Sequence, residues 1–179
     1  MKAVETNLKD VLVINLQSHL DTRGFFLESF NKEKFSELGI KYEFVQDNFS
    51  RSTRGVLRGL HFQKNNPQGK LVRCSSGAVL DVVLDIDPKS PTFLDSVAIE
   101  LTCENSKALW IPPGYAHGFY VLSDFADFSY KCTDFYYPDD QYGIIWNDPD
   151  AKIPWPTSKP IMSQKDLSLP LISKYLAKR

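Results

Sequence analysis

Three histidines, His19, His61 and His117, are the side chains of this 179-residue sequence whose ordinary pKa best suits proton transfer near neutral pH. His61 lies in the segment RGLHFQ and His117 in GYAHGFY, and both segments are typical of strands. A histidine in a strand is either a hydrogen-bonded structural residue or a general base, and the polar groups that flank His61 favour a chemical role there. His19 lies in a polar segment that we expect to be a solvated loop.

A metal centre is the alternative use of histidine in a small β-barrel. A catalytic metal needs at least three nitrogen or oxygen ligands, often with two close along one strand as in an HxH pair. Neither His61 nor His117 has a histidine two residues away. Cys74, Cys103 and Cys132 are widely spaced and form no CxxC pair, so we expect buried core thiols, not a zinc finger or a disulfide framework. No functional metal is predicted.

Basic side chains gather between residues 51 and 73, with two glycines among them. One interpretation is a solvated surface that balances the acidic residues. The other is a pocket for a multiply charged anion, because guanidinium groups grip phosphate oxygens in pairs and glycine allows a ligand to approach closely. The residues alone leave both interpretations open. They are Arg51, Arg54, Arg58, Lys70 and Arg73, with Gly55 and Gly59.

Arg58 and His61 are three residues apart, so in a regular strand their side chains point to opposite faces of the sheet. Both can face one pocket only if the strand is bulged at Gly59 or if Arg58 stands at the strand end. A shared pocket therefore predicts an irregular strand at this position.

Alternation of apolar and polar residues with a period of two dominates the chain and predicts strands. The clearest is Ala78–Ile86, in which every even-numbered residue is apolar while the odd positions include Asp81 and Asp85. About ten short strands, separated by turns rich in Gly, Pro, Ser and Asp, favour a sandwich or barrel. The other expected strands are Val11–Leu16, Gly24–Phe30, Phe44–Ser50, Val56–Gln63, Lys70–Cys74, Asp95–Leu101, Ala108–Ile111, Ala116–Leu122 and Phe125–Thr133.

Helical signals are few. Asn31 can cap a short helix that ends at Gly39. Ser163 can cap a turn over residues 164–166, and Pro170 can open a last helix near the end of the chain.

The composition, with 42% hydrophobic and 24% charged residues, is typical of a soluble globular protein and excludes a disordered or collagen-like chain. A chain of this length is expected to form one domain over residues 1–179. A formal net charge of -1 provides no basic field for nucleic acid or for an anionic membrane. No stretch approaches the roughly 20 apolar residues that cross a bilayer, and no signal peptide is evident, so we expect the protein in the cytoplasm.

Eight segments of the chain form a pattern by their order and spacing. They are DTRGFFLESF (Asp21–Phe30), QDNFSRSTRGVLRGLHFQ (Gln46–Gln63), QGKLVRC (Gln68–Cys74), DVVLDIDPKSPTF (Asp81–Phe93), LWIPPGYAHGFYVLS (Leu109–Ser123), YKCTDFYYP (Tyr130–Pro138), GIIWNDP (Gly143–Pro149) and SQKD (Ser163–Asp166). This pattern resembles the dTDP-4-dehydrorhamnose 3,5-epimerase family over residues 11–170. The resemblance implies an all-β fold, a cupin-like jelly roll (a double-stranded β-helix) with a few short helices, which is one form of the sandwich or barrel expected above.

The resemblance implies an enzyme that inverts C3 and C5 of dTDP-4-dehydro-6-deoxy-D-glucose and gives dTDP-4-dehydro-L-rhamnose. Both carbons flank the C4 ketone, so removal of either hydrogen gives an enolate whose charge spreads onto the C4 oxygen. Such a reaction needs a base on one face of the sugar, an acid on the other and a cation near that oxygen. It needs no cofactor.

By the family pattern His61 is the base, and Asp166 orients it in a pair that forms only on folding. Tyr130 matches the acid that returns a proton from the opposite face, and Lys70 matches the cation beside the developing oxyanion. From the residues alone, Asp166 is an acid at a helix start and Tyr130 a core ring, so both of these roles depend on the resemblance.

The resemblance also implies residues that bind the dTDP-linked 4-keto-6-deoxy sugar, and a homodimer. In this family the strand that carries Arg23 and Glu28 is donated to the pocket of the neighbouring subunit. Gln141 is a departure from a member of this family that has a glutamate in contact with the substrate at this position, and we expect an amide to change this contact and the fine substrate preference. The implied substrate-binding residues are Arg23, Glu28, Gln46, Asp47, Asn48, Arg58, His117, Gln141 and Lys165.

Three other functions share parts of this pattern. A single-site epimerase, acting only at C5 or C3 of a related nucleotide-linked 4-keto-6-deoxy sugar, would carry nearly the same motifs. A metal-dependent cupin enzyme would use the HxH pair that is missing here. A non-catalytic module that binds a nucleotide-sugar or a glycan would not need the acid–base set of His61, Lys70, Tyr130 and Asp166.

Overall fold

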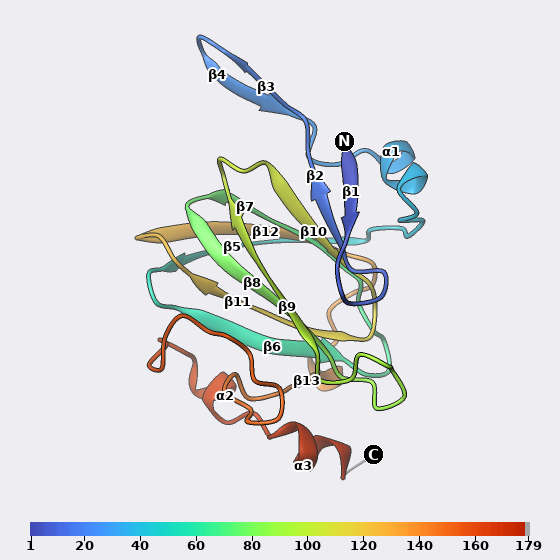
Figure 1. The fold of residues 1–179 in the computed structure, drawn as a ribbon, viewed down its shortest axis with the longest axis vertical. Coiled ribbons are helices and arrows are strands. Elements are labelled where there is room, and N and C mark those ends of the chain that lie inside the picture. Colours follow the sequence, from blue (N-terminus) through green and yellow to red (C-terminus); the bar gives the residue numbers. More distant parts are fainter. Residues whose placement is uncertain (178–179) are drawn as a thin grey trace.

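The structure, a computed structural model, describes residues 1–177 and consists mainly of two antiparallel sheets that face each other (Figure 1). The expected domain of residues 1–179 includes Lys178 and Arg179, which lie outside the described residues. The six-stranded sheet contains, in spatial order, β1 (Lys2–Glu5), β2 (Leu12–Asn15), β10 (Lys107–Ile111), β7 (Lys70–Ser76), β12 (Phe125–Cys132) and β5 (Gln46–Thr53). The five-stranded sheet contains β13 (Gln141–Gly143), β6 (Leu57–Gln63), β11 (Tyr115–Val121), β8 (Ala78–Asp85) and β9 (Ser96–Thr102).

The chain passes repeatedly from one sheet to the other, because β5, β7, β10 and β12 belong to the first and β6, β8, β11 and β13 to the second. Two sheets wound together in this way form a double-stranded β-helix, so the predicted all-β jelly roll is confirmed. The helices among the described residues are short. They are α1 (Lys32–Glu37), α2 (Gln164–Leu167) and α3 (Ile172–Leu176), with one 3-10 turn at Pro138–Asp140.

Side-chain alternation along the strands builds the core between the sheets. Ala126, Phe128 and Tyr130 point inward from β12, and Phe119 and Val121 point inward from β11. The rings of Phe119 and Phe128, one from each sheet, stack with their centroids 4.3 Å apart. The same alternation therefore decides which polar residues of each strand face the interior.

The C-terminal segment covers the outer face of the five-stranded sheet. Leu84 and Val82 of β8 pack against Ala151, Ile172 and Tyr175, so the even positions of this strand are buried on the outer side of the sheet. In Figure 1 this segment, coloured orange to red, runs below β6. It thereby brings α2 close to β6.

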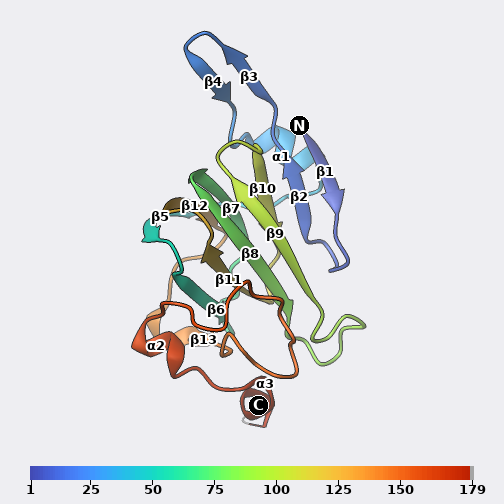
Figure 2. The same cartoon turned by 60° about the vertical axis from the view of Figure 1, so that its left-hand side comes forward.

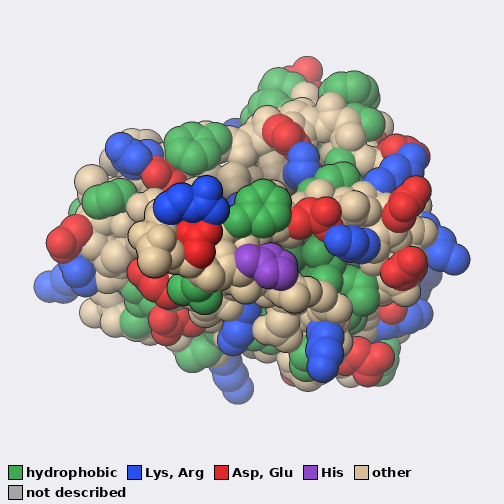
Figure 3. All heavy atoms as spheres, turned by 90° about the horizontal axis from the view of Figure 1, so that it is seen from above, with side chains coloured by type: hydrophobic (Ala, Val, Ile, Leu, Met, Phe, Trp, Pro, Cys, Tyr) green, Lys and Arg blue, Asp and Glu red, His purple; other side chains and the backbone are tan. Residues whose placement is uncertain are grey.

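The hairpin of β3 (Ser18–Asp21) and β4 (Gly24–Leu27) projects away from the sandwich (Figures 1 and 2). Its apolar side chains lie in solvent in the single chain, with Leu20 83% exposed, Phe26 70% and Phe25 55%. Figure 3, which views the molecule from the hairpin end, shows acidic and basic side chains interspersed with hydrophobic ones. A hairpin that buries so little surface needs another contact to be stable.

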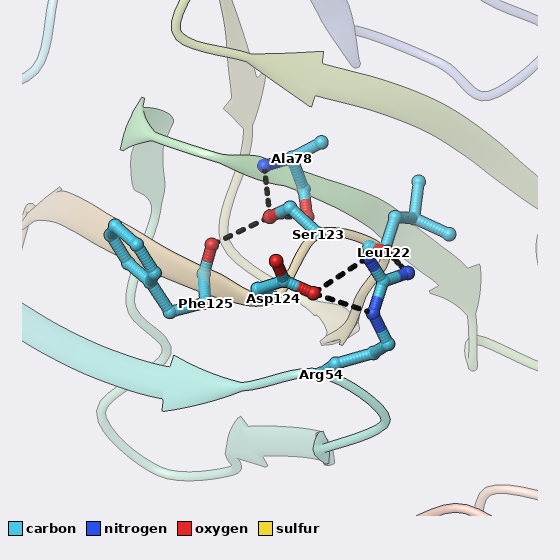
Figure 4. A network of polar contacts seen from close by, with 6 residues as sticks. All are labelled: Arg54, Ala78, Leu122, Ser123, Asp124 and Phe125. Carbon is cyan, nitrogen blue, oxygen red and sulfur yellow. Dashed lines mark hydrogen bonds and ion pairs between the residues drawn. The ribbon is translucent and has the colours of Figure 1, made fainter.

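A polar network fixes the turn between β11 and β12 (Figure 4). The Ser123 hydroxyl accepts from Ala78 N at 2.8 Å and donates to Phe125 O at 2.6 Å. Arg54 forms an ion pair with Asp124 at 3.0 Å and also donates to a carbonyl of this turn. These bonds connect the two sheets at the start of β8.

Most of the predicted strands are confirmed within two residues at each end. The strand predicted at Gly24–Phe30 is wrong in its second half, because the chain turns there to enter α1, whose cap is Asn31. His19 lies in β3 and not in a loop, although it is exposed as expected. The strand predicted at Phe44–Ser50 lies at Gln46–Thr53, since β12 pairs with all of those residues.

The predicted helix caps are also confirmed. The Asn31 side chain accepts a hydrogen bond from Lys34 N at 3.2 Å. The Ser163 side chain accepts one from Asp166 N at 3.1 Å. The last helix begins at Ile172, two residues beyond Pro170.

Candidate active site

A cavity of about 660 Å³ opens between the two sheets. Strands β6 and β11 provide one wall and strands β5, β7 and β12 the opposite wall, while residues 161–166 lie at its mouth. Of the predicted catalytic set, all four residues line this cavity: His61, Lys70, Tyr130 and Asp166.

Helix α2 brings Asp166 to His61 across 105 residues of sequence. The distance between His61 Nε2 and Asp166 Oδ1 is 2.7 Å, and Gly59 N donates to the other carboxylate oxygen at 3.4 Å. Because Nε2–H donates to the carboxylate, Nδ1 remains as the basic atom of the ring. The predicted pair is therefore formed in the fold.

The charge of Asp166 is maintained by its neighbours. Burial raises the pKa of Asp166, but the hydrogen bond and the charge of His61 oppose it, as do the donors Gly59 N and Ser163. The result is a pKa below the ordinary value for aspartate. Asp166 is a carboxylate at neutral pH and stabilises an imidazolium when His61 takes up a proton.

Strand β6 carries the bulge that a shared pocket requires. His61 is paired with His117 and Arg58 with Phe119, so an extra residue of β6 lies between the two pairs. Gly59 has a φ of +119°, and a side chain there would lie 2.6 Å from the backbone of β11. The predicted irregularity at Gly59 is thus confirmed, and Arg58 and His61 both face the cavity.

Lys70 enters the cavity from β7. It shares the inward face of this strand with Val72 and Cys74, which belong to the core. Burial lowers the pKa of Lys70, and Cys132 and Asp81 act in the opposite direction. Within residues 1–177 the Lys70 ammonium makes no ion pair or hydrogen bond, so it is available to a ligand.

Tyr130 lies on the wall opposite His61. Burial raises the pKa of Tyr130, Cys132 and Tyr136 raise it further, and the charge of Arg58 lowers it. A phenol with a raised pKa stays protonated at neutral pH, so Tyr130 carries a proton that it can donate, and the ring of His61 on the opposite wall can accept one.

Other predicted substrate-binding residues surround these groups. The Gln141 side-chain oxygen accepts from the Lys165 ammonium and from the Tyr136 hydroxyl, the latter at 2.9 Å. Arg58 Nε donates to Ser52 Oγ at 3.0 Å. The predicted substrate-binding residues that line the cavity are Gln46, Asn48, Arg58, His117, Gln141 and Lys165.

Arg23, Glu28 and Asp47 do not line the cavity of their own chain. Arg23 forms an ion pair with Asp21 within the hairpin, and Glu28 forms one with Lys34 at 2.8 Å. Asp47 is on the outer face of β5 because side chains alternate along a strand, and its neighbours Gln46 and Asn48 face inward. Substrate contacts by these three residues stay predictions.

Some basic residues between positions 51 and 73 line the cavity, as expected for an anion pocket, and the others lie on the surface. Arg58 and Lys70 face the cavity, as an anion pocket requires. Arg51 pairs with Asp127 at 2.7 Å on the surface, and Arg54 takes part in the turn network described above. Arg73 alternates with the inward residues of β7 and faces outward.

Asp81, which bonds to the cavity residue His117, and Tyr136 were not among the predicted site residues. Asp81 is fully buried and bonded to His117, and its signal in the sequence was a carboxylate within an otherwise apolar strand. Tyr136 lines the cavity with a ring that is 45% exposed, and an aromatic triplet after β12 was its only signal.

No group of three or more His, Cys, Asp or Glu residues in positions 1–177 is arranged to hold a metal ion. Over the same residues, none of the helices has the length and apolar character that a membrane span requires.

Known proteins are similar to this chain in sequence and in fold. A sequence model described as dTDP-4-dehydrorhamnose 3,5-epimerase matches residues 5–174. A dTDP-4-dehydrorhamnose 3,5-epimerase from Salmonella typhimurium is 49% identical over 98% of this chain and 98% of its own. A dTDP-4-dehydrorhamnose 3-epimerase from Streptomyces niveus is 34% identical over 97% of this chain and 85% of its own.

A crystal structure of a dTDP-6-deoxy-D-glucose-3,5-epimerase from Legionella pneumophila in complex with dTDP-4-keto-L-rhamnose has a closely similar fold. Its TM-score is 0.95 at 46% identity, and the match covers 99% of this chain and 95% of the Legionella chain. The similarity therefore extends over both sheets and the C-terminal segment.

Proposed function

We propose a mechanism for this chain from the premise that it belongs to the dTDP-4-dehydrorhamnose 3,5-epimerase family. It is an epimerase that inverts C3 and C5 of dTDP-4-dehydro-6-deoxy-D-glucose and gives dTDP-4-dehydro-L-rhamnose. The observation that supports the mechanism is one cavity with a carboxylate-bound histidine on one wall and a lysine and a tyrosine on the other.

Each inversion removes a proton and returns one to the opposite face of the same carbon. His61 Nδ1 takes the proton from C5 or C3, and the electrons of the C–H bond move to the C4 oxygen. The Lys70 ammonium stabilises the resulting enolate. Tyr130 then delivers its phenolic proton from the other wall of the cavity, which leaves the carbon inverted. Tyr130 regains a proton and His61 releases one to solvent before the second carbon reacts.

The remaining lining residues suit a nucleoside diphosphate. Arg58 offers a guanidinium fork, and His117 and Lys165 add further donors for phosphate oxygens. The exposed ring of Tyr136 offers an apolar face to a planar base. We infer that the diphosphate lies along these cations, with the sugar between His61 and Tyr130.

The double reaction is favoured over the single-site alternative. Identity to the Salmonella 3,5-epimerase is 49%, against 34% for the Streptomyces 3-epimerase, over nearly the whole chain in both cases. Both reactions use the same base and acid, so the count of inverted carbons is what distinguishes them.

Deuterium incorporation in D₂O, followed by NMR, tests this function directly. We expect dTDP-4-dehydro-6-deoxyglucose to acquire deuterium at both C3 and C5 and to appear as the doubly inverted sugar. Exchange at one carbon alone would identify a single-site epimerase. Absence of exchange at both carbons in folded wild-type protein would contradict the proposed reaction.

We further propose a homodimer in which the β3–β4 hairpin of each subunit completes the other's pocket. The hairpin projects from its own body with exposed Leu20, Phe25 and Phe26, and its Arg23 is engaged only within the hairpin. A pocket in a second copy would cover these apolar side chains and use the arginine for the nucleotide-sugar.

Mixing two inactive variants tests the exchange. Arg23→Ala leaves the pocket of its own chain intact, and His61→Ala leaves its hairpin intact. If hairpins are exchanged, one pocket in each mixed dimer is complete, and a refolded equal mixture should regain about a quarter of wild-type activity. Activity no higher than the sum of the two separate variants would show that each hairpin serves its own chain.

We also infer that the enzyme acts in the cytoplasm and supplies a deoxysugar for polysaccharide synthesis. Cys74, Cys103 and Cys132 are all free thiols, which suits a reducing compartment. A nucleotide-activated sugar is the usual donor for glycosyl transfer, and the product keeps its activating diphosphate because only C3 and C5 react.

A further inference from the structure

A second histidine–carboxylate pair adjoins the cavity, which His117 lines and behind which Asp81 is buried. His117 Nε2 lies 2.9 Å from Asp81 Oδ2 and 3.0 Å from Oδ1. Asp81 is fully buried, and His117 is 8% exposed. His117 is the direct cross-strand partner of His61, so the two pairs are adjacent in the five-stranded sheet.

Burial makes the Asp81 carboxylate dependent on this pair. A carboxylate removed from water is costly unless a hydrogen-bond donor or a cation compensates it. In the described part of the chain, the side chain that bonds to Asp81 is His117, whose ring also lies against Phe128. The carboxylate therefore holds a proton on Nε2 and fixes the plane of the ring. His117 Nδ1 has no bond to residues 1–177, and once it is protonated it can donate to a phosphate oxygen, because the Asp81 carboxylate stabilises the ring that carries both protons.

Asp81 also acts on Lys70 across the cavity. Asp81 is the carboxylate that favours the charged form of Lys70, and the Cys132 thiol of β12 acts in the same direction. The other titratable groups that line the cavity are His61 and Arg58 of β6, His117 of β11, Tyr130 of β12, Tyr136, and Lys165 and Asp166 of α2. Arg58 carries a further positive charge, which makes the negative charge of Asp81 more important for keeping a second cation there.

We propose that Asp81 is a positioning residue of the epimerisation site: it fixes His117 for the diphosphate and balances the positive charge of Lys70. The proposal depends on the proposed function for the identity of the ligand. It assigns different tasks to the two carboxylates, since Asp166 serves the base and Asp81 serves binding and the oxyanion cation.

Asp81→Asn removes the charge and nearly preserves the shape. We expect KM for the nucleotide-sugar, and the Kd of dTDP measured by calorimetry, to rise roughly 10–100-fold, by analogy with carboxylates that orient metal-binding histidines. The alkaline limb of the kcat–pH profile should move to lower pH, because the pKa of Lys70 falls further without the opposing charge. Loss of a carboxylate with a purely structural role would leave KM, the Kd of dTDP and the alkaline limb of the profile unchanged.

Asp85→Asn is the matched control. Asp85 lies on the same strand, is 3% exposed, and bonds to Thr92 and to the backbone of Asp87, away from the cavity. This variant should lose stability while it keeps wild-type KM and the wild-type alkaline limb. If folded Asp81→Asn protein also keeps both, the proposal is wrong.

The wild-type protein gives a second test that needs no variant to fold. Since the chain has 3 histidines, its ¹⁵N-histidine NMR spectrum is simple to assign. We expect Nε2 of His117 to be protonated and its Nδ1 resonance to shift on addition of dTDP, while exposed His19 gives the reference signal. An unprotonated Nε2 in His117, or an Nδ1 resonance that stays unchanged when dTDP binds, would overturn the proposal. Failure of the proposed function would instead appear as absent deuterium exchange by the wild-type protein.

Discussion

His61→Ala is expected to lower turnover by roughly 10²–10⁴-fold and to leave the fold intact. His61 is the histidine whose Nε2 is held by Asp166 at 2.7 Å, and the loss of its Nδ1 removes the base from one wall of the cavity. The side chain is 27% exposed at the edge of the cavity, so its removal creates no closed void in the core. Initial rates of deuterium exchange at C3 and C5 measure the effect, and circular dichroism reports the fold.

Asp166→Ala provides the comparison. The imidazole remains in this variant but is no longer held in one orientation, so we expect a smaller loss of turnover than for His61→Ala. In the wild-type protein the lowered pKa of Asp166 keeps its carboxylate ionised at neutral pH, so it holds the imidazole in place. Wild-type exchange rates in folded His61→Ala protein would remove this assignment.

Tyr130→Phe is expected to separate proton exchange from inversion. The enolate should still form, because His61 and Lys70 are unchanged, but the proton donor on the opposite wall is missing. Reprotonation then comes mostly from the His61 side or from water. We expect deuterium to enter the substrate while the yield of inverted sugar falls by roughly 10²-fold or more. NMR follows both quantities in one sample.

Tyr137→Phe is the control for this substitution, since Tyr137 is close in sequence but does not line the cavity. It should leave both exchange and inversion unchanged. Equal losses of exchange and inversion in Tyr130→Phe would mean that Tyr130 serves enolate formation or substrate placement. Unchanged inversion would identify another residue or a bound water as the donor.

The sequence predicted the strands well because alternation is a local property that each strand repeats. The three-residue spacing of Arg58 and His61 also predicted that they could share a pocket only if the strand were irregular, and the structure has a bulge at Gly59. By contrast, the partner of His61 could not be found from spacing, since Asp166 is 105 residues away and reaches it only through the path of the C-terminal segment. The resemblance supplied that pairing.

The sequence did not predict which side chains of β7 and β8 face the cavity, the surface or the core, because that depends on how each face of the strand is covered. Arg73 and Lys70 belong to the same basic cluster in sequence, yet their positions three apart on β7 place one outside and one inside. Asp81 lies in the strand whose even positions are apolar, which suggests that odd positions face solvent. In the fold both faces of β8 are covered, so a lone carboxylate there is buried and must be paired.

The position of Asp166 on α2 also means that one part of the site is made after the strands of both sheets. A growing chain can pair the strands of both sheets before α2 has been made, because the last of them, β13, ends at Gly143. At that stage His61 is in place without its carboxylate, and the outer face of β8 lacks Ile172 and Tyr175. Chains that end before α2 thus lack the carboxylate that orients His61, and they expose apolar side chains on the outer face of β8.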